Sequence, residues 1–405
     1  MKKEHLIVMI EKTFEKARKK NGGEYADNSY LSRMKTYVNQ KITEKVIELG
    51  NEKYYNPKFW KGSWMDEYVE ESIDRYHADE LSATRIEGMI HAVHAFASAV
   101  KEFKTFGKGT KKVRVGLKGG VKQKEGQLNR LHEEGVIDSK DHVTSMKPKG
   151  DELERVKAAI PNTVRNYDSI IKALDSQSHT GGRIKAELRL RVGDIDYVNK
   201  TKKYKKDKHG FNRRVQIKDE FLDFYREMER GKPKGAPLYP FFDRQGKQMD
   251  DDSASRHAQE ILKIAVDKAG VNYEKVIEKQ NRDGSKREVT VEMRFTSHSN
   301  RRGFAQGEYD KTRYWKKSKI IEAIGEYLNL QGSNKEKIIA RIDNERDRLN
   351  YRNIKYRKPK RDFTWEQLRM LYVALQLGHS RIDIGKRYVD TDEPIWKRKK
   401  KLKTE

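Results

Sequence analysis

The chain of 405 residues contains no cysteine. This absence excludes disulfide bonds, thiolate catalysis and every zinc site built on sulfur ligands. No apolar run is long enough to anchor the chain in a membrane, no cluster of side chains suggests a metal site, and the residues after Met1 are charged rather than signal-like. We therefore expect a soluble, cytoplasmic protein.

Apolar residues are also scarce, at 35% of the chain, whereas charged residues make up 37%. Lysine and arginine number 89 against 62 aspartates and glutamates, which gives a net charge of +27. A charge of this size favours a polyanionic partner, because each phosphate contact releases counterions. Nucleic acid fits first. An anionic membrane surface fits less well, because no amphipathic anchor stands out.

The length predicts two or three domains. Residues 1–145 are expected to form a helical N-terminal, DNA-binding domain. Within it, Ser82 is a suitable N-cap for a helix over 82–103, whose apolar residues recur at helical spacing as Ile86, Met89, Ile90, Val93, Phe96 and Val100. Core packing is the preferred interpretation of these residues.

The segment 107–124 combines five glycines with seven basic residues. Glycine lowers order and the cations attract phosphate. A DNA-contacting loop and a solvated flexible loop are equally good interpretations. A linker is expected at residues 145–150, which contain a proline and a glycine.

Residues 146–393 are expected to form a second domain, followed by a basic tail over 394–405. Helical patterns alternate here with two short strands, 195–198 and 214–217, joined by a lysine-rich turn over 202–208. An Asp-Gly step at 283–284 predicts a further hairpin, and Thr364 with Gln367 predicts a capping box that opens a helix ending at Gly378. The expected fold class is mainly α with a small antiparallel β-sheet (α+β).

The clearest pattern of candidate catalytic residues lies near the end of this domain. Leu377-Gly378-His379 is followed by Tyr388, nine positions after the histidine, among arginines and a lysine. A tyrosine hydroxyl has an ordinary pKa near ~10, so it attacks a phosphate only when cations and a base activate it. Two earlier motifs carry suitable groups. Arg183 follows Thr180-Gly181-Gly182 and opens a helix, while His298 and Arg301 lie three apart and so share a helix face.

Each motif alone is weak, but their order resembles that of the tyrosine recombinase (phage-type integrase) family. The family's Thr-Gly-x-Arg, Glu-Leu and Asp-Ile-Asp are matched by residues 180–183, 187–188 and 194–196. Its His-x-x-Arg is matched by His298 and Arg301, and its Leu-Gly-His with a tyrosine nine residues on by His379 and Tyr388. The match spans residues ~151–392. The resemblance implies a core-binding domain followed by a recombinase catalytic domain.

Phosphoryl transfer then suggests a role for each group. Arg183 and Arg301 would hold the non-bridging oxygens, because guanidinium forks match phosphate and stay charged. The resemblance implies that Tyr388 attacks and forms a 3′-phosphotyrosyl bond. His298 would accept or shuttle the tyrosine proton, and His379 would hydrogen-bond the phosphate or the lysine network. Neither a metal nor another cofactor is needed, because the covalent bond conserves the energy.

The leaving 5′ oxygen requires a proton, and a lysine in the 202–208 turn fits this general-acid role. Aligning residues 213–217 with the family's second strand places Lys208 there, with Lys206 close behind. Three more lysines make the choice ambiguous: Lys202, Lys203 and Lys205.

The chain departs from the family in two places. His298 and His379 lie 81 positions apart, and the charged, helical insertion 308–363 fills the difference. Its segment 351–358 interleaves aromatic and basic residues, which suits phosphate contact and stacking. A surface insertion tolerated in a loop is an equally good interpretation. The insertion leaves open whether Tyr388 acts in its own subunit or a neighbour's. The other departure, Gly182 in place of the usual large apolar residue, looks minor.

Three functions remain. The leading one is a recombinase or integrase of a phage or mobile element, assembled as a homotetramer on two sites of double-stranded DNA, with accessory DNA-bending or directionality proteins as further partners. A DNA-binding repressor that keeps the fold but does not recombine is the main alternative. A type IB topoisomerase-like nicking enzyme fits the Leu-Gly-His segment less well.

Overall fold

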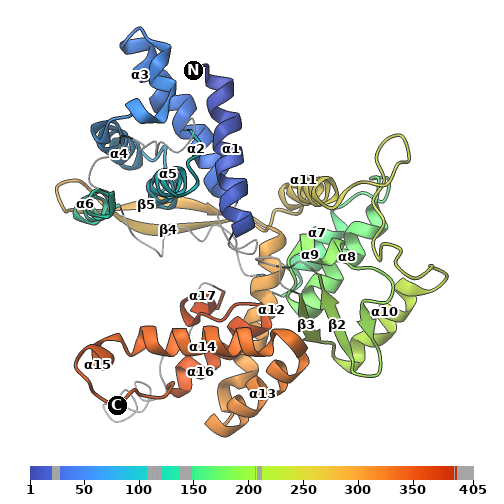
Figure 1. The fold of residues 1–405 in the computed structure, drawn as a ribbon. Helices are drawn as coiled ribbons and strands as arrows, with labels where there is room; N and C mark the ends of the chain where they lie inside the picture. The colour runs from blue at the N-terminus through green and yellow to red at the C-terminus, as the bar shows by residue number, and fades with distance from the viewer. Residues whose placement is uncertain are drawn as a thin grey trace. The chain divides into compact units, whose positions relative to one another are not determined.

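The computed structural model describes residues 1–20, 28–106, 116, 120–136, 148, 150–205, 207, 212–386 and 388–389. The chain forms two compact units (Figure 1). The N-terminal unit comprises Met1–His142 together with Lys275–Val291, and the C-terminal unit comprises Val143–Glu274 and Glu292–Glu405. Most of the glycine- and lysine-rich segment 107–124, Lys206, Lys208 and the tail 394–405 lie outside the described residues.

The N-terminal unit is built on helices. They are α1 (Lys3–Lys20), α2 (Asn28–Tyr37), the π-helix η1 (Val38–Ile42), α3 (Thr43–Glu48), the short 3₁₀ turns η2 (Glu52–Tyr55) and η3 (Pro57–Phe59), α4 (Gly62–His77), α5 (Ala83–Phe103) and α6 (Gly120–Glu133). The predicted helix over 82–103 is confirmed as α5, with Ser82 at its N-cap. The six apolar residues predicted to face a core on this helix are all buried.

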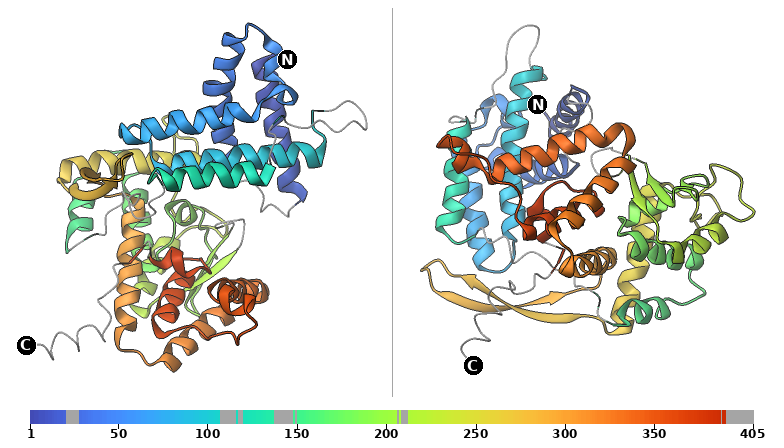
Figure 2. Two further views of the ribbon diagram at one scale, coloured as in Figure 1. Left: turned by 90° about the vertical axis from the view of Figure 1, so that its left-hand side faces the viewer. Right: turned by 90° about the horizontal axis from the view of Figure 1, so that it is seen from below.

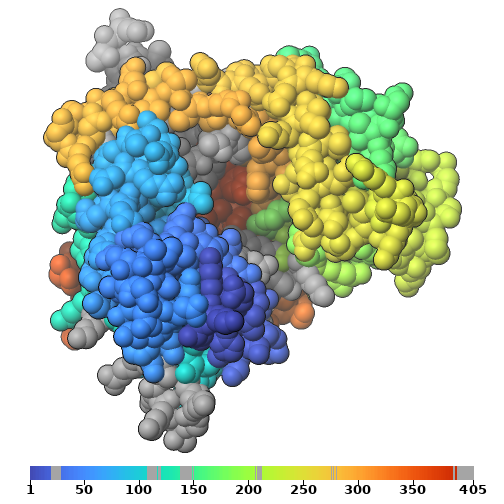
Figure 3. Space-filling view, turned by 90° about the horizontal axis from the view of Figure 1, so that it is seen from above, coloured from blue at the N-terminus to red at the C-terminus, as the bar shows by residue number. Residues whose placement is uncertain are grey.

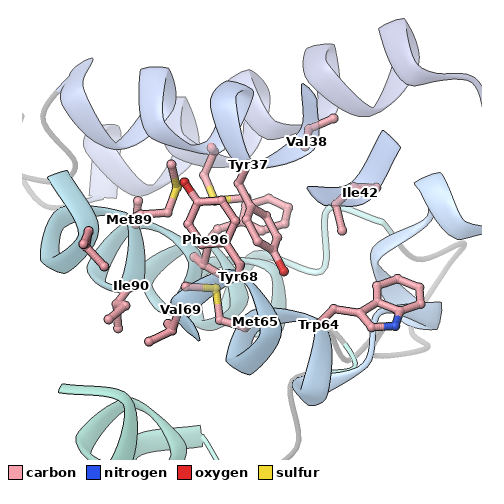
Figure 4. Close-up of a cluster of buried hydrophobic side chains, with 14 of the residues drawn as sticks. Tyr37, Val38, Ile42, Trp64, Met65, Tyr68, Val69, Met89, Ile90 and Phe96 are labelled. Atoms are coloured by element: carbon pink, nitrogen blue, oxygen red, sulfur yellow. The ribbon is translucent and has the colours of Figure 1, made fainter. Parts of the chain in front are cut away.

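Aromatic and methionine side chains fill the core of this unit (Figure 4). The rings of Tyr37 and Tyr68 meet edge to face with their centroids 5.4 Å apart, and Phe96 lies beside them. Edge-to-face pairs are favoured by the ring quadrupoles, so they add to the stabilisation that burial itself gives.

The hairpin of β4 (Tyr273–Gln280) and β5 (Lys286–Met293) confirms the turn predicted at Asp283-Gly284. It forms one extended ribbon (Figure 2). Its side chains contact the N-terminal unit: Lys279 Nζ lies 2.5 Å from Asp79, Arg282 Nη1 lies 2.7 Å from Asp74, and Arg287 donates to the His77 carbonyl at 2.8 Å. The chain therefore passes between the two units three times, after residues 142, 274 and 291.

The C-terminal unit contains the remaining helices. They are α7 (Glu152–Ala158), α8 (Tyr167–Thr180), α9 (Ile184–Leu188), α10 (Leu222–Glu229) after the 3₁₀ turn η5 (Asp219–Phe221), α11 (Asp251–Ala269), α12 (Ser297–Lys311), η6 (Thr312–Tyr314), α13 (Lys317–Leu330), η7 (Gly332–Asn334), α14 (Lys335–Leu349), α15 (Tyr351–Lys355), α16 (Trp365–Gln376) and α17 (Ile382–Lys386). Figure 3 shows the yellow surface of α11 beside the green segment that includes α7, on which it packs. No described helix is long and apolar enough to cross a membrane.

A three-stranded antiparallel sheet, ordered β1 (Ile195–Asp196), β2 (Thr201–Tyr204) and β3 (Arg213–Gln216), also belongs to this unit. The prediction of a lysine-rich turn over 202–208 is wrong at its start, because Lys202 and Lys203 belong to β2 and the connection begins after Tyr204. The Lys202 side chain is buried because its ammonium pairs with the buried carboxylate of Glu187. The predicted fold class, mainly α with small antiparallel sheets, is confirmed.

Candidate active site

Arg301 lies at the centre of the candidate site, on the first turns of α12. The helix is capped by Thr296, whose hydroxyl accepts the His298 N–H at 3.2 Å in a capping box with Ser299. The Arg301 side chain is fully buried and donates to the carbonyl of Gly181 and to the carbonyl of Leu377. One guanidinium thus joins the loop before Arg183 to the loop before His379, segments almost 200 positions apart in sequence.

Arg183 reaches the same site from the other side. Gly181 ends α8 in the left-handed region at φ +61°, which turns the chain so that Arg183 becomes the N-cap of α9. Its Nη1 lies 2.6 Å from Asp207, and its Nη2 donates to Nε2 of His379 at 3.1 Å. The first and last motifs predicted from the sequence therefore meet through side chains.

Asp207 is a member of the site that the sequence did not single out. Its carboxylate is buried between Arg183 and Arg213, whose Nε lies 2.9 Å away. Burial opposes ionisation, but the charges of Arg213 and Arg183 hold the pKa of Asp207 well below its usual range. Arg213 also donates to the Gln376 carbonyl at 2.6 Å. In the sequence, Asp207 could have been noticed as the acidic residue between Lys206 and Lys208 in a basic segment.

Tyr388 is half-buried and lies in the same chain's site. Its ring centroid is 5.4 Å from Cζ of Arg301 and 6.2 Å from the centroid of the His379 ring. Its N–H donates to the Gly385 carbonyl at 2.9 Å, so the residue continues the turn that ends α17. Tyr388, the predicted nucleophile, therefore lies beside Arg301 and His379 of the same chain.

The protonation states suit a reaction at a phosphate. Loss of hydration around the His298 ring, together with the charges of Arg301 and Arg183, lowers the pKa of this histidine. A neutral imidazole can accept a proton. Burial and the charge of Arg183 lower the pKa of Arg301 to about 10, which still leaves it a cation at neutral pH.

The identity of the general-acid lysine stays a prediction, because Lys208 and Lys206 lie outside the described residues. The structure argues against one of the other candidates, because Lys202 is fully buried with Nζ 2.9 Å from Glu187. Lys205 is half-exposed and forms an ion pair with Asp194 at 2.6 Å. Lys203 and Lys205 stay candidates.

Behind the site lies a closed polar group that we name the Glu187 cluster: Ser176, Glu187, Lys202, Tyr204 and Tyr225. Glu187 accepts from Ser176 Oγ at 2.7 Å, from Lys202 and from the Tyr204 hydroxyl. Gly182 fits against this cluster, and a Cβ there would collide with Glu187 and Tyr204. The replacement of a large residue by Gly182 is therefore not minor, because the cluster occupies the space.

The insertion 308–363 is not a tolerated surface loop. Ile320, Ile324 and Tyr327 of α13 are buried in the core that also contains Leu371 of α16. Its segment 351–356, which contains α15, does carry exposed aromatics, Tyr351 and Tyr356, among basic residues. The first half of the insertion therefore belongs to the folded unit.

A pocket of about 60 Å³ opens beside the site, between the β2–β3 connection and α14. Its lining includes Asp207, Arg213, Lys337, Arg341 and His379. Arg213, Lys337 and Arg341 give the lining three cations, which suits an anion such as a phosphate. Among the described residues, no group of three or more histidine, aspartate or glutamate side chains could hold a metal ion.

Comparison with solved structures finds DNA recombinases. The chain is similar to the XerH site-specific recombinase bound to difH substrate, with 15% identity, coverage of 96% of this chain and 82% of that one, and a TM-score of 0.48. It is also similar to the Tn1549 transposon integrase in complex with transposon right end DNA (13%, 98% and 99%, 0.48) and to a lambda integrase dimer bound to a core site (11%, 95% and 98%, 0.44).

No family model and no curated protein matches the chain. The solved structures that it resembles are recombinases and integrases, the family that the sequence motifs resemble. At these identities and scores the likeness carries no argument about activity, which depends on the site itself.

Proposed function

We propose that this protein is a site-specific DNA recombinase or integrase of the tyrosine type, from a phage or mobile element. The observation that carries the proposal is the convergence of Arg183, Arg301, His379 and Tyr388 on one site, with His298 one turn before Arg301 on α12. These residues come from three separate segments of the chain. A protein that only bound DNA would have no need of a tyrosine beside a phosphate-binding arginine pair.

The geometry supports a two-step phosphoryl transfer. The Tyr388 hydroxyl attacks a DNA phosphodiester, passes its proton to His298, and forms a 3′-phosphotyrosyl bond while the bond to the 5′ oxygen breaks. Arg183 and Arg301 stabilise the charge that builds on the non-bridging oxygens. The 5′ hydroxyl of another strand then attacks the phosphotyrosine and restores both the DNA and the enzyme.

In this reaction a lysine of the β2–β3 connection, Lys208 in our assignment, protonates the leaving 5′ oxygen. His379 hydrogen-bonds the phosphate and keeps Arg183 in place. Asp207 is paired with Arg183 in the free protein. A phosphate must therefore displace the Asp207 carboxylate from Arg183, or bind the same guanidinium beside it. No step requires a metal or a nucleotide, because the phosphotyrosyl bond conserves the energy of the phosphodiester.

Double-stranded DNA is the partner, and the net charge of +27 supplies the long-range attraction. Recombination would proceed in a homotetramer on two DNA sites, with strands exchanged in pairs through a Holliday junction. Accessory DNA-bending or directionality proteins would act with it.

The first experiment looks for the covalent intermediate. Sites are selected by binding from a library of randomised inverted repeats, and the selected sequence is built into a nicked suicide substrate. Wild-type protein should form a covalent DNA adduct, and Tyr388→Phe should form none. Binding without any adduct would favour the repressor, and an adduct in Tyr388→Phe would exclude this nucleophile.

A second substrate identifies the general acid. A 5′-phosphorothiolate linkage needs no proton on its leaving group. We expect Lys208→Ala to be slow on normal DNA and to recover on this substrate, while Lys206→Ala is the matched control. Recovery of the Lys206 variant instead would move the assignment to that residue.

A further inference from the structure

The segment that carries the nucleophile has little structure of its own. The helix α17 has only five residues, and isolated helices of this length do not persist in water. Its position must therefore be fixed by contacts from elsewhere in the unit. One such contact is at Gly385, where an added Cβ would lie 2.9 Å from the Met370 carbonyl of α16.

A second contact comes from the insertion. Glu345 lies in the last third of α14 and is 3% exposed, which is rare for a carboxylate. Its Oε1 accepts the N–H of Ile382, the first residue of α17, at 3.0 Å. Arg348 donates to both oxygens of the same carboxylate, at 2.9 and 2.7 Å. The first N–H groups of a helix lack partners within it, so this carboxylate caps α17 from a distant helix.

The junction between α13 and α14 contacts the β2–β3 side of the site. Gln331, at the end of α13, accepts the Arg214 N–H at 3.1 Å and donates to the Arg214 carbonyl at 2.8 Å, as a neighbouring strand would. Asn334 donates to the Asn212 carbonyl at 2.9 Å. The insertion therefore touches both the β2–β3 connection and the helix that leads to Tyr388.

We propose that Glu345 is a positioning residue for Tyr388, and that the α13–α14 pair fixes the distance between the tyrosine and the phosphate-binding arginines. This inference rests on the proposed function. The insertion then explains how the chain tolerates 81 positions between His298 and His379: the added helices align the nucleophile. A misplacement of about 1 Å can slow such a reaction by ~100-fold.

The test separates alignment from binding and from folding. Glu345→Ala, Glu345→Gln and the control Glu336→Ala, an exposed glutamate on the same helix, are compared with wild type in full-length protein. Single-turnover adduct formation and the DNA dissociation constant are measured on the selected suicide substrate. Amide hydrogen exchange is measured without DNA.

We expect Glu345→Ala to form adduct ~10- to 100-fold more slowly, with the dissociation constant within about twofold of wild type. Exchange at residues 382–385 should rise while exchange in α16 stays unchanged. Glu345→Gln should recover part of the rate, because its amide oxygen still accepts the Ile382 N–H. Glu336→Ala should behave as wild type.

Unchanged exchange at 382–385 in Glu345→Ala would overturn the contact between α14 and α17. Raised exchange with a wild-type cleavage rate would overturn the positioning role and leave only a structural cap. If wild-type protein forms no adduct, the proposed function fails and the catalytic part of this inference falls with it. The exchange data decide the structural part in either case.

Discussion

Two buried ionic groups lie side by side in the C-terminal unit, and they differ in how completely they are satisfied. In the Glu187 cluster, Lys202 and Glu187 are both fully buried and hydrogen-bonded to each other, to Ser176 and to tyrosine hydroxyls. In the second group, which we name the Asp207 cluster (Arg183, Asp207 and Arg213), the Arg183 side chain is 22% exposed. Nη2 of buried Arg213 has no hydrogen-bond partner among the residues that the structure describes.

The difference separates structure from chemistry. A buried ionic group with every donor paired holds a fold in place, and replacing it changes stability. A group with a spare donor and one reachable guanidinium can take up a phosphate without unfolding anything. The comparison predicts that substitutions in the Glu187 cluster act on stability and that substitutions in the Asp207 cluster act on catalysis.

The largest effect is expected for Glu187→Ala. Removing the carboxylate leaves Lys202 as an unpaired buried cation, which should cost about 3–5 kcal/mol of unfolding free energy. Urea unfolding of wild type and variant measures the loss. In the double variant Glu187→Leu/Lys202→Met the loss should be much smaller than in Glu187→Ala, because no charge remains buried. An equally unstable double variant would show that packing, and not the ion pair, dominates.

Arg183→Ala should act in the opposite way. Loss of one phosphate-binding donor should slow adduct formation by about 10²–10³-fold, while the urea midpoint moves little because the side chain is partly exposed. Arg189→Ala on the same helix segment is a control, since Arg189 bonds Asp251 instead. A large loss of stability in Arg183→Ala would contradict the division between the two clusters.

Sequence reasoning went far for this site because its motifs are local. Arg183, His298, Arg301, His379 and Tyr388 each lie within a short pattern. The structure brings Arg183, Arg301, His379 and Tyr388 into contact, and His298 lies on the same helix as Arg301. Asp207 and Glu345 could not be found in this way. Each has a partner that local patterns do not point to, Arg183 for Asp207 and the Ile382 N–H for Glu345, and an acidic residue in a charged segment is ordinarily solvated.

The secondary structure shows the same limit. The helix α5 and the capping box of α16 were predictable because periodicity and caps are local. Lys202 was assigned to a turn because lysine is rarely buried. It lies in β2 instead, and its partner Glu187 is 15 positions away in sequence, so no local pattern points to it. The role of α13 as core was ambiguous because its apolar stripe is embedded in charge.

Acid should lower the free energy of unfolding through His179, which is influenced by the charge of Lys202 in the Glu187 cluster. The ring of His179 stacks on Phe221 with centroids 3.7 Å apart, and burial together with the charge of Lys202 lowers its pKa to about 4. The unfolded chain, at about 6.5, therefore binds more protons between these values. The stabilisation is complete above pH 6.5 and is lost as pH falls towards 4.

For wild type this group should cost about 2 kcal/mol between pH 7 and pH 5. His179→Phe keeps the stacked ring and should lose that part of the pH dependence. The check is the difference in unfolding free energy between variant and wild type at the two pH values, since other groups cancel in it. An unchanged difference would mean that His179 is not held neutral.

The smallest effect tests the border between the clusters, at Gly182. A methyl group there would meet Glu187 and Tyr204 of the Glu187 cluster, while the next residue, Arg183, belongs to the Asp207 cluster. We expect Gly182→Ala to destabilise by about 1–3 kcal/mol, as overpacking does, and to slow adduct formation only in proportion to the unfolded fraction. Gly325→Ala, where nothing lies within 4 Å of an added Cβ, is the control at an open position. If Gly182→Ala leaves stability intact but slows cleavage, the two clusters are mechanically coupled, and the Glu187 cluster belongs to the catalytic machinery after all.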